Sequence, residues 1–167
     1  MKRIPLTKGQ FALVDDQDYQ WLNQWRWRYH KSTNGKTGYA FRNERIGPGK
    51  RRHVSMHRLI MGAGEKQEVD HVDTNGINNQ RSNLRVCTRT QNRSNLSAYR
   101  TNTSGFKGVS WDKGARKWAA RIAAKGRRIH LGLFTNKIEA AHAYNQAALR
   151  YHGEFAHLNN VQEEAAE

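Results

Sequence analysis

The order of apolar and polar residues in the last third of the chain predicts a small sheet covered by one helix. Residues 117–124 and 127–134 alternate as half-buried strands do, and residues 106–111 supply a third strand. The apolar residues expected to share one face are Trp118, Ala120, Ile122, Ile129, Leu131 and Leu133. After Asn136, a predicted helix cap, the apolar spacing changes to three and four up to about His152. The helix should cover one sheet face and leave the basic face free.

The middle of the chain predicts two strands followed by a helix. The two strands, residues 67–71 and 84–87, flank a polar, turn-rich loop over residues 72–82. Thr88 and Gln91 have the spacing of a capping box, so a helix should begin there with Asn92 in its first turn. A further short helix is expected over residues 55–61, ended by Gly62.

The first third predicts small β elements around aromatic residues. We expect a hairpin of residues 4–7 and 11–14, a helix over residues 16–24, and strands at residues 25–29 and 39–42, with turns at residues 33–35 and 47–49. The fold class is therefore α+β. The predicted organisation is a β-rich N-terminal segment (1–54), a central domain (55–97), a linker (98–104), a three-strand-plus-helix domain (105–159) and an acidic tail (160–167).

The charge of the chain points to a polyanionic partner. Lys and Arg number 29 against 14 Asp and Glu, which gives a net charge of +15, so DNA or RNA is the expected partner. An anionic membrane surface is the competing possibility, but no apolar run is long enough for a spanning helix and no signal peptide follows Met1. One cysteine, Cys87, excludes a disulfide framework and a Cys-based zinc site. We expect a soluble, cytoplasmic protein that does not bind membranes.

The residues around the central loop predict phosphodiester chemistry. Hydrolysis needs an activated water, and the imidazole of His71 suits the role of general base because its free pKa lies near neutrality. A hard cation held by Asp70 and Asn92, expected to be Mg²⁺ or Mn²⁺, would stabilise the phosphoryl charge and the departing oxygen. Asn83 would hydrogen-bond the loop backbone and fix the direction of the imidazole.

The set Asp70, His71, Asn83 and Asn92 resembles the HNH endonuclease signature in its H-N-N form. The runs at residues 57–60 and 78–85 are similar to the phage homing-endonuclease branch of that family. The resemblance implies a ββα-metal fold in which the residue matching His71 is the general base and those matching Asp70 and Asn92 bind the metal. The chain lacks the paired Cys-x-x-Cys motifs of many HNH proteins, so no structural zinc is expected.

The C-terminal region resembles the Apetala-type, or ethylene-response-factor, DNA-binding domain. The matching runs lie at residues 105–109, 117–122, 128–134 and 140–148. The resemblance implies a sheet that docks in the major groove of double-stranded DNA, with the expected contact residues Lys107, Lys117, Arg121, Arg128 and His130. Several positions depart from the plant pattern, so its sequence preference does not transfer.

The sequence favours one function, and two alternatives are kept beside it. The favoured function is a metal-dependent endonuclease that acts on duplex DNA inside a bacterial or phage-infected cell. The second is a DNA-binding regulator whose central finger has only a structural role, and the third is a protein that binds or cleaves RNA. Single residues also have plain structural readings: His57 suits packing better than metal binding, and His130 suits either a DNA contact or solvated surface.

Overall fold

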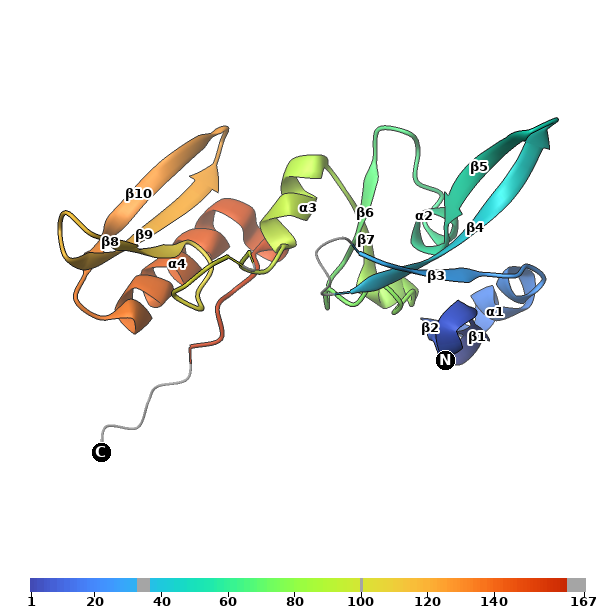
Figure 1. Cartoon of the computed structure of the whole chain (residues 1–167), viewed down its shortest axis with the longest axis horizontal. Coiled ribbons are helices and arrows are strands. Elements are labelled where there is room, and N and C mark those ends of the chain that lie inside the picture. The colour runs from blue at the N-terminus through green and yellow to red at the C-terminus, as the bar shows by residue number, and fades with distance from the viewer. Residues whose placement is uncertain (33–36, 100, 162–167) are drawn as a thin grey trace. The chain divides into compact units, whose positions relative to one another are not determined.

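The computed structural model describes residues 1–32, 37–99 and 101–161, and it divides into two compact units, Met1–Asn92 and Arg93–Glu167. The described chain is a mixed α+β protein with several small antiparallel sheets and four α-helices (Figure 1). The turn predicted at residues 33–35 and most of the acidic tail lie outside the described residues.

The first unit begins with a hairpin and a helix. Strands β1 (Lys2–Pro5) and β2 (Phe11–Val14) pair around a 3₁₀ turn (Thr7–Gly9), and helix α1 (Asp16–Asn23) follows. The sequence predicted all three elements but placed the first strand at residues 4–7, two residues too late, because Thr7 already belongs to the turn. Their apolar side chains form one core, because Ile4, Val14 and Leu22 are almost fully buried and pack with residues of the following elements.

A three-stranded sheet follows, in which β3 (Arg28–Lys31), β4 (Gly38–Gly47) and β5 (Lys50–Ser55) pair in order. Figure 1 shows the β4–β5 hairpin extending beyond β3. The strand predicted at residues 25–29 was placed too early. The backbone N–H of Trp25 and the indole of Trp27 both donate to the Leu22 carbonyl, so this segment closes the end of α1 before β3 starts.

The central hairpin matches its sequence prediction closely. Helix α2 (Met56–Ile60) leads into β6 (Glu68–His71), which pairs with β7 (Leu84–Cys87) before helix α3 (Arg89–Asn95). The predicted capping box is present: the Thr88 N–H donates to Gln91 Oε1 at 2.8 Å, and the Gln91 N–H donates to Thr88 Oγ1 at 3.3 Å.

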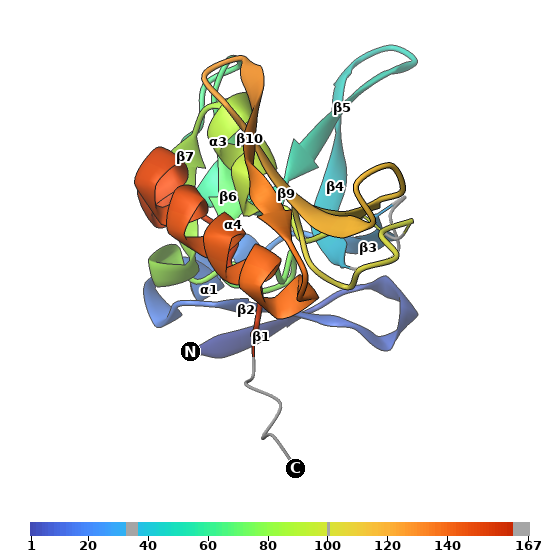
Figure 2. The ribbon, with the colours of Figure 1, turned by 90° about the vertical axis from the view of Figure 1, so that its left-hand side faces the viewer.

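The second unit has three antiparallel strands and one long helix. The strands are β8 (Val109–Asp112), β9 (Lys117–Ala124) and β10 (Arg127–Phe134), and helix α4 (Lys137–His152) leads into a 3₁₀ turn (Gly153–Phe155). Asn136 caps α4 as predicted, accepting from the Ile138 N–H at 2.8 Å. Figure 2 shows α4 against β9 and β10, and its buried alanines let the helix approach the sheet closely.

One side-chain direction in β10 differs from the prediction. The register of β10 against β9 shifts between His130 and Gly132, so Leu131 is an extra residue in the ladder. This bulge reverses the alternation that follows it. Leu131 still packs on the core, but Leu133 is 41% exposed rather than buried beside it. The basic face itself is open, as expected.

No helix in the described part of the chain has the length and apolar character required to span a membrane.

Candidate nuclease centre

The loop between β6 and β7 is shaped by Asn83. Its amide nitrogen donates to Asp73 Oδ1 at 2.9 Å and to the Asn78 carbonyl at 2.8 Å, while its amide oxygen accepts from the Asp73 N–H at 3.0 Å. Asp73 in turn accepts from the Asn75 N–H at 2.8 Å. A buried amide that uses both its donor and acceptor groups fixes the loop conformation. Asn83 therefore determines the path of the chain directly after His71.

His71 lies at the end of β6 and is 5% exposed. Its Nε2 is 3.4 Å from Oδ1 of Asn79, a fully buried residue whose own N–H donates to the Leu13 carbonyl at 2.8 Å. Burial lowers the pKa of His71, and the Asn79 contact and the Asp73 and Asp70 carboxylates oppose that shift. Burial thus favours the neutral imidazole, and in the tautomer that donates Nε2–H to Asn79 the basic nitrogen is Nδ1.

The second predicted site residue, Asp70, forms an ion pair across the hairpin. Arg85 stands opposite Asp70 in the register of β6 and β7. Its Nε and Nη2 lie 2.9 Å and 2.6 Å from Asp70 Oδ2, and both side chains are largely buried. Arg85 was not among the residues predicted for the site, although the alternation of the two strands places it on the face of Asp70 once their register is known.

Asn92 reaches the same hairpin through Glu68. The Asn92 amide donates to Glu68 Oε2 at 2.7 Å. Glu68 and Asp70 are two residues apart on β6 and therefore project from the same face of the strand. Burial raises the pKa of the Cys87 thiol to about 11, and the Asp70 and Glu68 carboxylates add to that rise. The structure brings Asn92 to this carboxylate-bearing face, and Glu68 is an additional residue that sequence reasoning did not select.

The oxygen donors on this face have the chemistry that a hard cation prefers. Asp70, Glu68 and Asn92 supply two carboxylates and an amide, which suit Mg²⁺ better than a thiophilic metal. Among the described residues, no group of three or more His, Cys, Asp or Glu side chains is arranged to hold a metal ion. A cation at Asp70 would therefore depend on the Asn92 amide and on water or substrate oxygens, and it would bind a carboxylate that Arg85 also holds.

His57 and Tyr39 pack against the imidazole of His71. The His57 and His71 ring centroids are 5.0 Å apart, and the Tyr39 centroid lies 5.7 Å and 5.8 Å from them. Burial is the main reason that the pKa of His57 is lowered to about 3, with the neighbouring His71 and Arg58 adding to it. Its Nδ1 is buried without a hydrogen-bond partner among the described residues.

Of the five residues expected to contact DNA, four lie on the sheet of the second unit and Lys107 lies outside it. Lys117, Arg128 and His130 are exposed on the sheet. Arg121 is half-buried and lies 3.3 Å from Ser110 Oγ and 3.4 Å from Asp112 Oδ2. Lys107 precedes β8, and its ammonium donates to the Ser94 carbonyl at 2.5 Å.

Burial also lowers the pKa of Lys107 to about 8. Lys107 thus anchors the chain next to α3, whereas the other four residues share the sheet.

Two known proteins are similar to this chain in sequence. Over 157 residues the chain is 29% identical to "Uncharacterized HNH endonuclease L560" of Acanthamoeba polyphaga mimivirus, covering 92% of this chain and 77% of that protein. This similarity supports the expected resemblance to HNH endonucleases. The chain belongs to the family of "Protein 3.8" of Escherichia phage T7, with 31% identity over 107 residues, which are 64% of this chain and 88% of the phage protein. No family model and no solved structure matches the chain.

Proposed function

We propose that the protein is a metal-dependent HNH endonuclease that hydrolyses phosphodiester bonds in duplex DNA. The observation that carries this proposal is the buried His71 beside Asp70 on β6, with Asn92 of α3 bonded to Glu68 of the same strand. The similarity to the mimivirus HNH endonuclease supports the reaction class. The similarity to a T7 protein supports action inside a phage-infected host cell.

His71 acts in this proposal as the general base. An imidazole that is neutral at pH 7 accepts a proton from the attacking water, which typically contributes about 10²- to 10⁴-fold in rate. In this proposal Nε2–H donates to the Asn79 oxygen, and Nδ1 takes the proton of the water. Asn83 positions the following loop, so it supports the direction of the imidazole without touching the substrate.

Asp70 and Asn92 would hold the metal in this proposal, with Glu68 as their neighbour. A bound Mg²⁺ or Mn²⁺ stabilises negative charge on the phosphoryl group and on the departing oxygen. Arg85 fixes the direction of the Asp70 carboxylate through two hydrogen bonds. No structural zinc is expected, because the chain has one cysteine and that residue lies in β7.

The sheet of the second unit grips duplex DNA in this proposal, as in the Apetala-type domains that it resembles. Lys117, Arg128 and His130 present their side chains on the face away from α4, and Arg121 lies between them. Each phosphate that a protein neutralises makes binding fall more steeply with salt, by a log–log slope of about 0.9. A binding affinity that does not change with salt would contradict this role of the sheet.

The proposal is tested by incubating supercoiled plasmid with the protein in Mg²⁺, Mn²⁺ or a chelator. We expect nicked or linear products with either metal and none with the chelator. The variant His71→Ala should lose cleavage by at least about a hundredfold and retain DNA affinity. The matched control His142→Ala removes an exposed histidine of α4 and should cut normally. An equal loss of cleavage and binding in His71→Ala would contradict the role of general base.

A DNA-binding regulator with a structural finger is the second candidate. Two observations favour it: Asp70 is already paired with Arg85, and His71 is almost fully buried. This function predicts duplex binding with no chelator-sensitive nicking in the same assay. Competition between duplex DNA and duplex RNA for the protein separates both candidates from an RNA-directed function.

A further inference from the structure

A cleft lies beside the central hairpin in the first unit. It has a volume of about 340 Å³, which is near the lower end of the range for small-molecule sites. One wall is a face of the β3–β4–β5 sheet, with Tyr39, Phe41 and His53, and the other wall includes His57, Glu68 and Asn92. The cleft has room for a single nucleotide and is far too small for a duplex.

The sheet wall of the cleft is built from stacked rings. The His53 imidazole lies over Phe41 with a centroid distance of 4.7 Å and an interplanar angle of 20°. His30 meets Phe41 edge-on at 6.0 Å. His53 is exposed, so one side of this stack faces outward. Flat side chains of this kind are the platforms on which proteins stack unpaired nucleic acid bases.

The opposite wall supplies hydrogen-bonding groups and adjoins the candidate nuclease centre. Glu68 and Asn92 bond to one another across the cleft lining, and both are polar groups that a base edge can contact. Asn92 is also the residue proposed to hold the metal. A base in the cleft would therefore belong to a nucleotide next to the phosphate that is cut.

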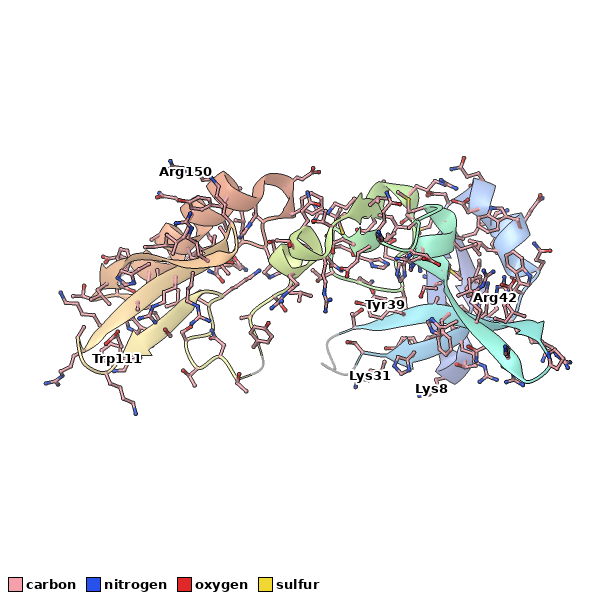
Figure 3. The ribbon with its side chains drawn as sticks, turned by 90° about the horizontal axis from the view of Figure 1, so that it is seen from above. Lys8, Lys31, Tyr39, Arg42, Trp111 and Arg150 are labelled. Carbon is pink, nitrogen blue, oxygen red and sulfur yellow. The ribbon has the colours of Figure 1, made fainter. Side chains whose placement is uncertain are left out.

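The same sheet face carries an uncompensated positive pair. Arg45 and Arg51 stand directly opposite one another in the β4–β5 register, an unfavourable arrangement for like charges that a bound anion would relieve. Alternation along β4 places Arg45 on the face of Phe41 and Tyr39 and places Arg42 on the other face; Tyr39 and Arg42 are labelled in Figure 3.

On that other face one carboxylate is shared by two arginines within the chain. Glu44 pairs with Arg42 at 3.1 Å and also with Arg52. Neither Arg45 nor Arg51 has an ion-pair partner in the described part of the chain. The two faces of one hairpin thus differ: on one, both arginines pair with Glu44, and on the other, two cations without an ion-pair partner in the described residues lie on the face of the cleft.

We propose that the cleft binds one unstacked nucleobase of the DNA strand to be cut, while Arg45 and Arg51 hold neighbouring phosphates of that strand. This inference rests on the proposed nuclease function and adds a substrate class, duplex DNA with an extrahelical base at the cutting site. The base stacks on His53, and its edge contacts the Glu68 and Asn92 side.

The test measures affinity by fluorescence anisotropy in chelator, so that no DNA is cut. Two labelled duplexes are compared, one fully paired and one identical except for a single bulged base. The bulged duplex should bind more tightly, because the cost of extruding the base is already met. The variant His53→Ala should reduce this preference about five- to a hundredfold. His53→Phe keeps a flat ring and should restore it, and His142→Ala should leave it unchanged.

The proposed phosphate contacts are tested with the double variant Arg45→Ala/Arg51→Ala in the same assay. This variant should weaken both duplexes alike and reduce the salt slope by about 1.8, which is two phosphate contacts. Its matched control, Lys8→Gln/Lys31→Gln, removes the same charge from positions that do not line the cleft and should keep the slope (Figure 3).

The outcomes separate this inference from the nuclease proposal. Equal affinity of the wild-type protein for the two duplexes, or an unchanged preference in His53→Ala, would overturn the nucleobase site even if plasmid is cut. An unchanged salt slope in the double arginine variant would overturn the phosphate contacts. A preserved bulge preference in a protein that never cuts plasmid would refute the nuclease and support the cleft.

Discussion

The partly buried imidazole of His57 predicts that acid destabilises the first unit in a measurable way. The pKa of His57 is about 3 in the fold, below the ordinary histidine value of about 6.5. As the pH falls below about 6.5, the unfolded chain therefore takes up a proton that the folded chain does not. The folded state keeps its full stability above that pH and loses stability progressively down to about pH 3.

The magnitude follows from the same shift. Each pH unit within this window costs about 1.4 kcal/mol for one proton. Between pH 7 and pH 4.5, His57 alone should therefore lower the free energy of unfolding by about 2–3 kcal/mol. His71, whose pKa is also lowered by burial, adds to the loss in the same direction.

The variant His57→Phe isolates this contribution. It keeps a ring in the packed position against Tyr39 and His71 and removes the Nδ1 that has no partner. Urea unfolding should be followed at both pH values in a Trp111→Phe/Trp118→Phe background, which leaves Trp21, Trp25 and Trp27 as reporters of the first unit. We expect the acid loss to shrink by about 2–3 kcal/mol in the variant. The same acid loss with and without His57 would refute the reasoning.

Two further predictions concern packing and pairing in each unit. Gly108→Ala should unfold the second unit, because φ is +76° there and a Cβ would lie 2.1 Å from the Tyr144 ring; circular dichroism of the expressed variant checks this. Asp18→Ala should cost about 2–4 kcal/mol, because the carboxylate is 1% exposed and accepts two hydrogen bonds from Arg81. Asp16→Ala, which removes an exposed pair with the N-terminus, should have a much smaller effect on the urea midpoint, and equal effects would contradict the role of burial.

Local patterns predicted the elements that local interactions determine. The Thr88–Gln91 capping box and the Asn136 cap are formed by residues two or three positions apart, and both helices begin where the sequence placed them. Strands β9 and β10 have the predicted bounds because clean alternation ends at a two-residue turn. The length of the β4–β5 hairpin was missed, because residues 50–53 are all basic and show no apolar alternation.

Features that depend on strand register could not be predicted from the sequence. The bulge at Leu131 turns Leu133 outward, and a strict period of two cannot reveal an extra residue. The pairing of Arg85 with Asp70 depends on how the intervening loop closes, and that closure rests on Asn83. The sequence selected the residues of the candidate site but could not show that Asp70 pairs with a cation and Asn92 with Glu68. Their chemical roles stay predictions.

The hydrogen bonds between β2 and the central loop have a consequence for engineering. Leu13 donates its N–H to the Ile77 carbonyl and accepts from the Asn79 N–H, and Asp15 accepts from the Arg81 N–H at 2.8 Å. The β1–β2 hairpin therefore stabilises the loop that carries Asn79, the residue that contacts His71. A fragment that begins near residue 55 would lose these hydrogen bonds, so transplanting the proposed nuclease centre into another protein requires the chain from its first strand onward.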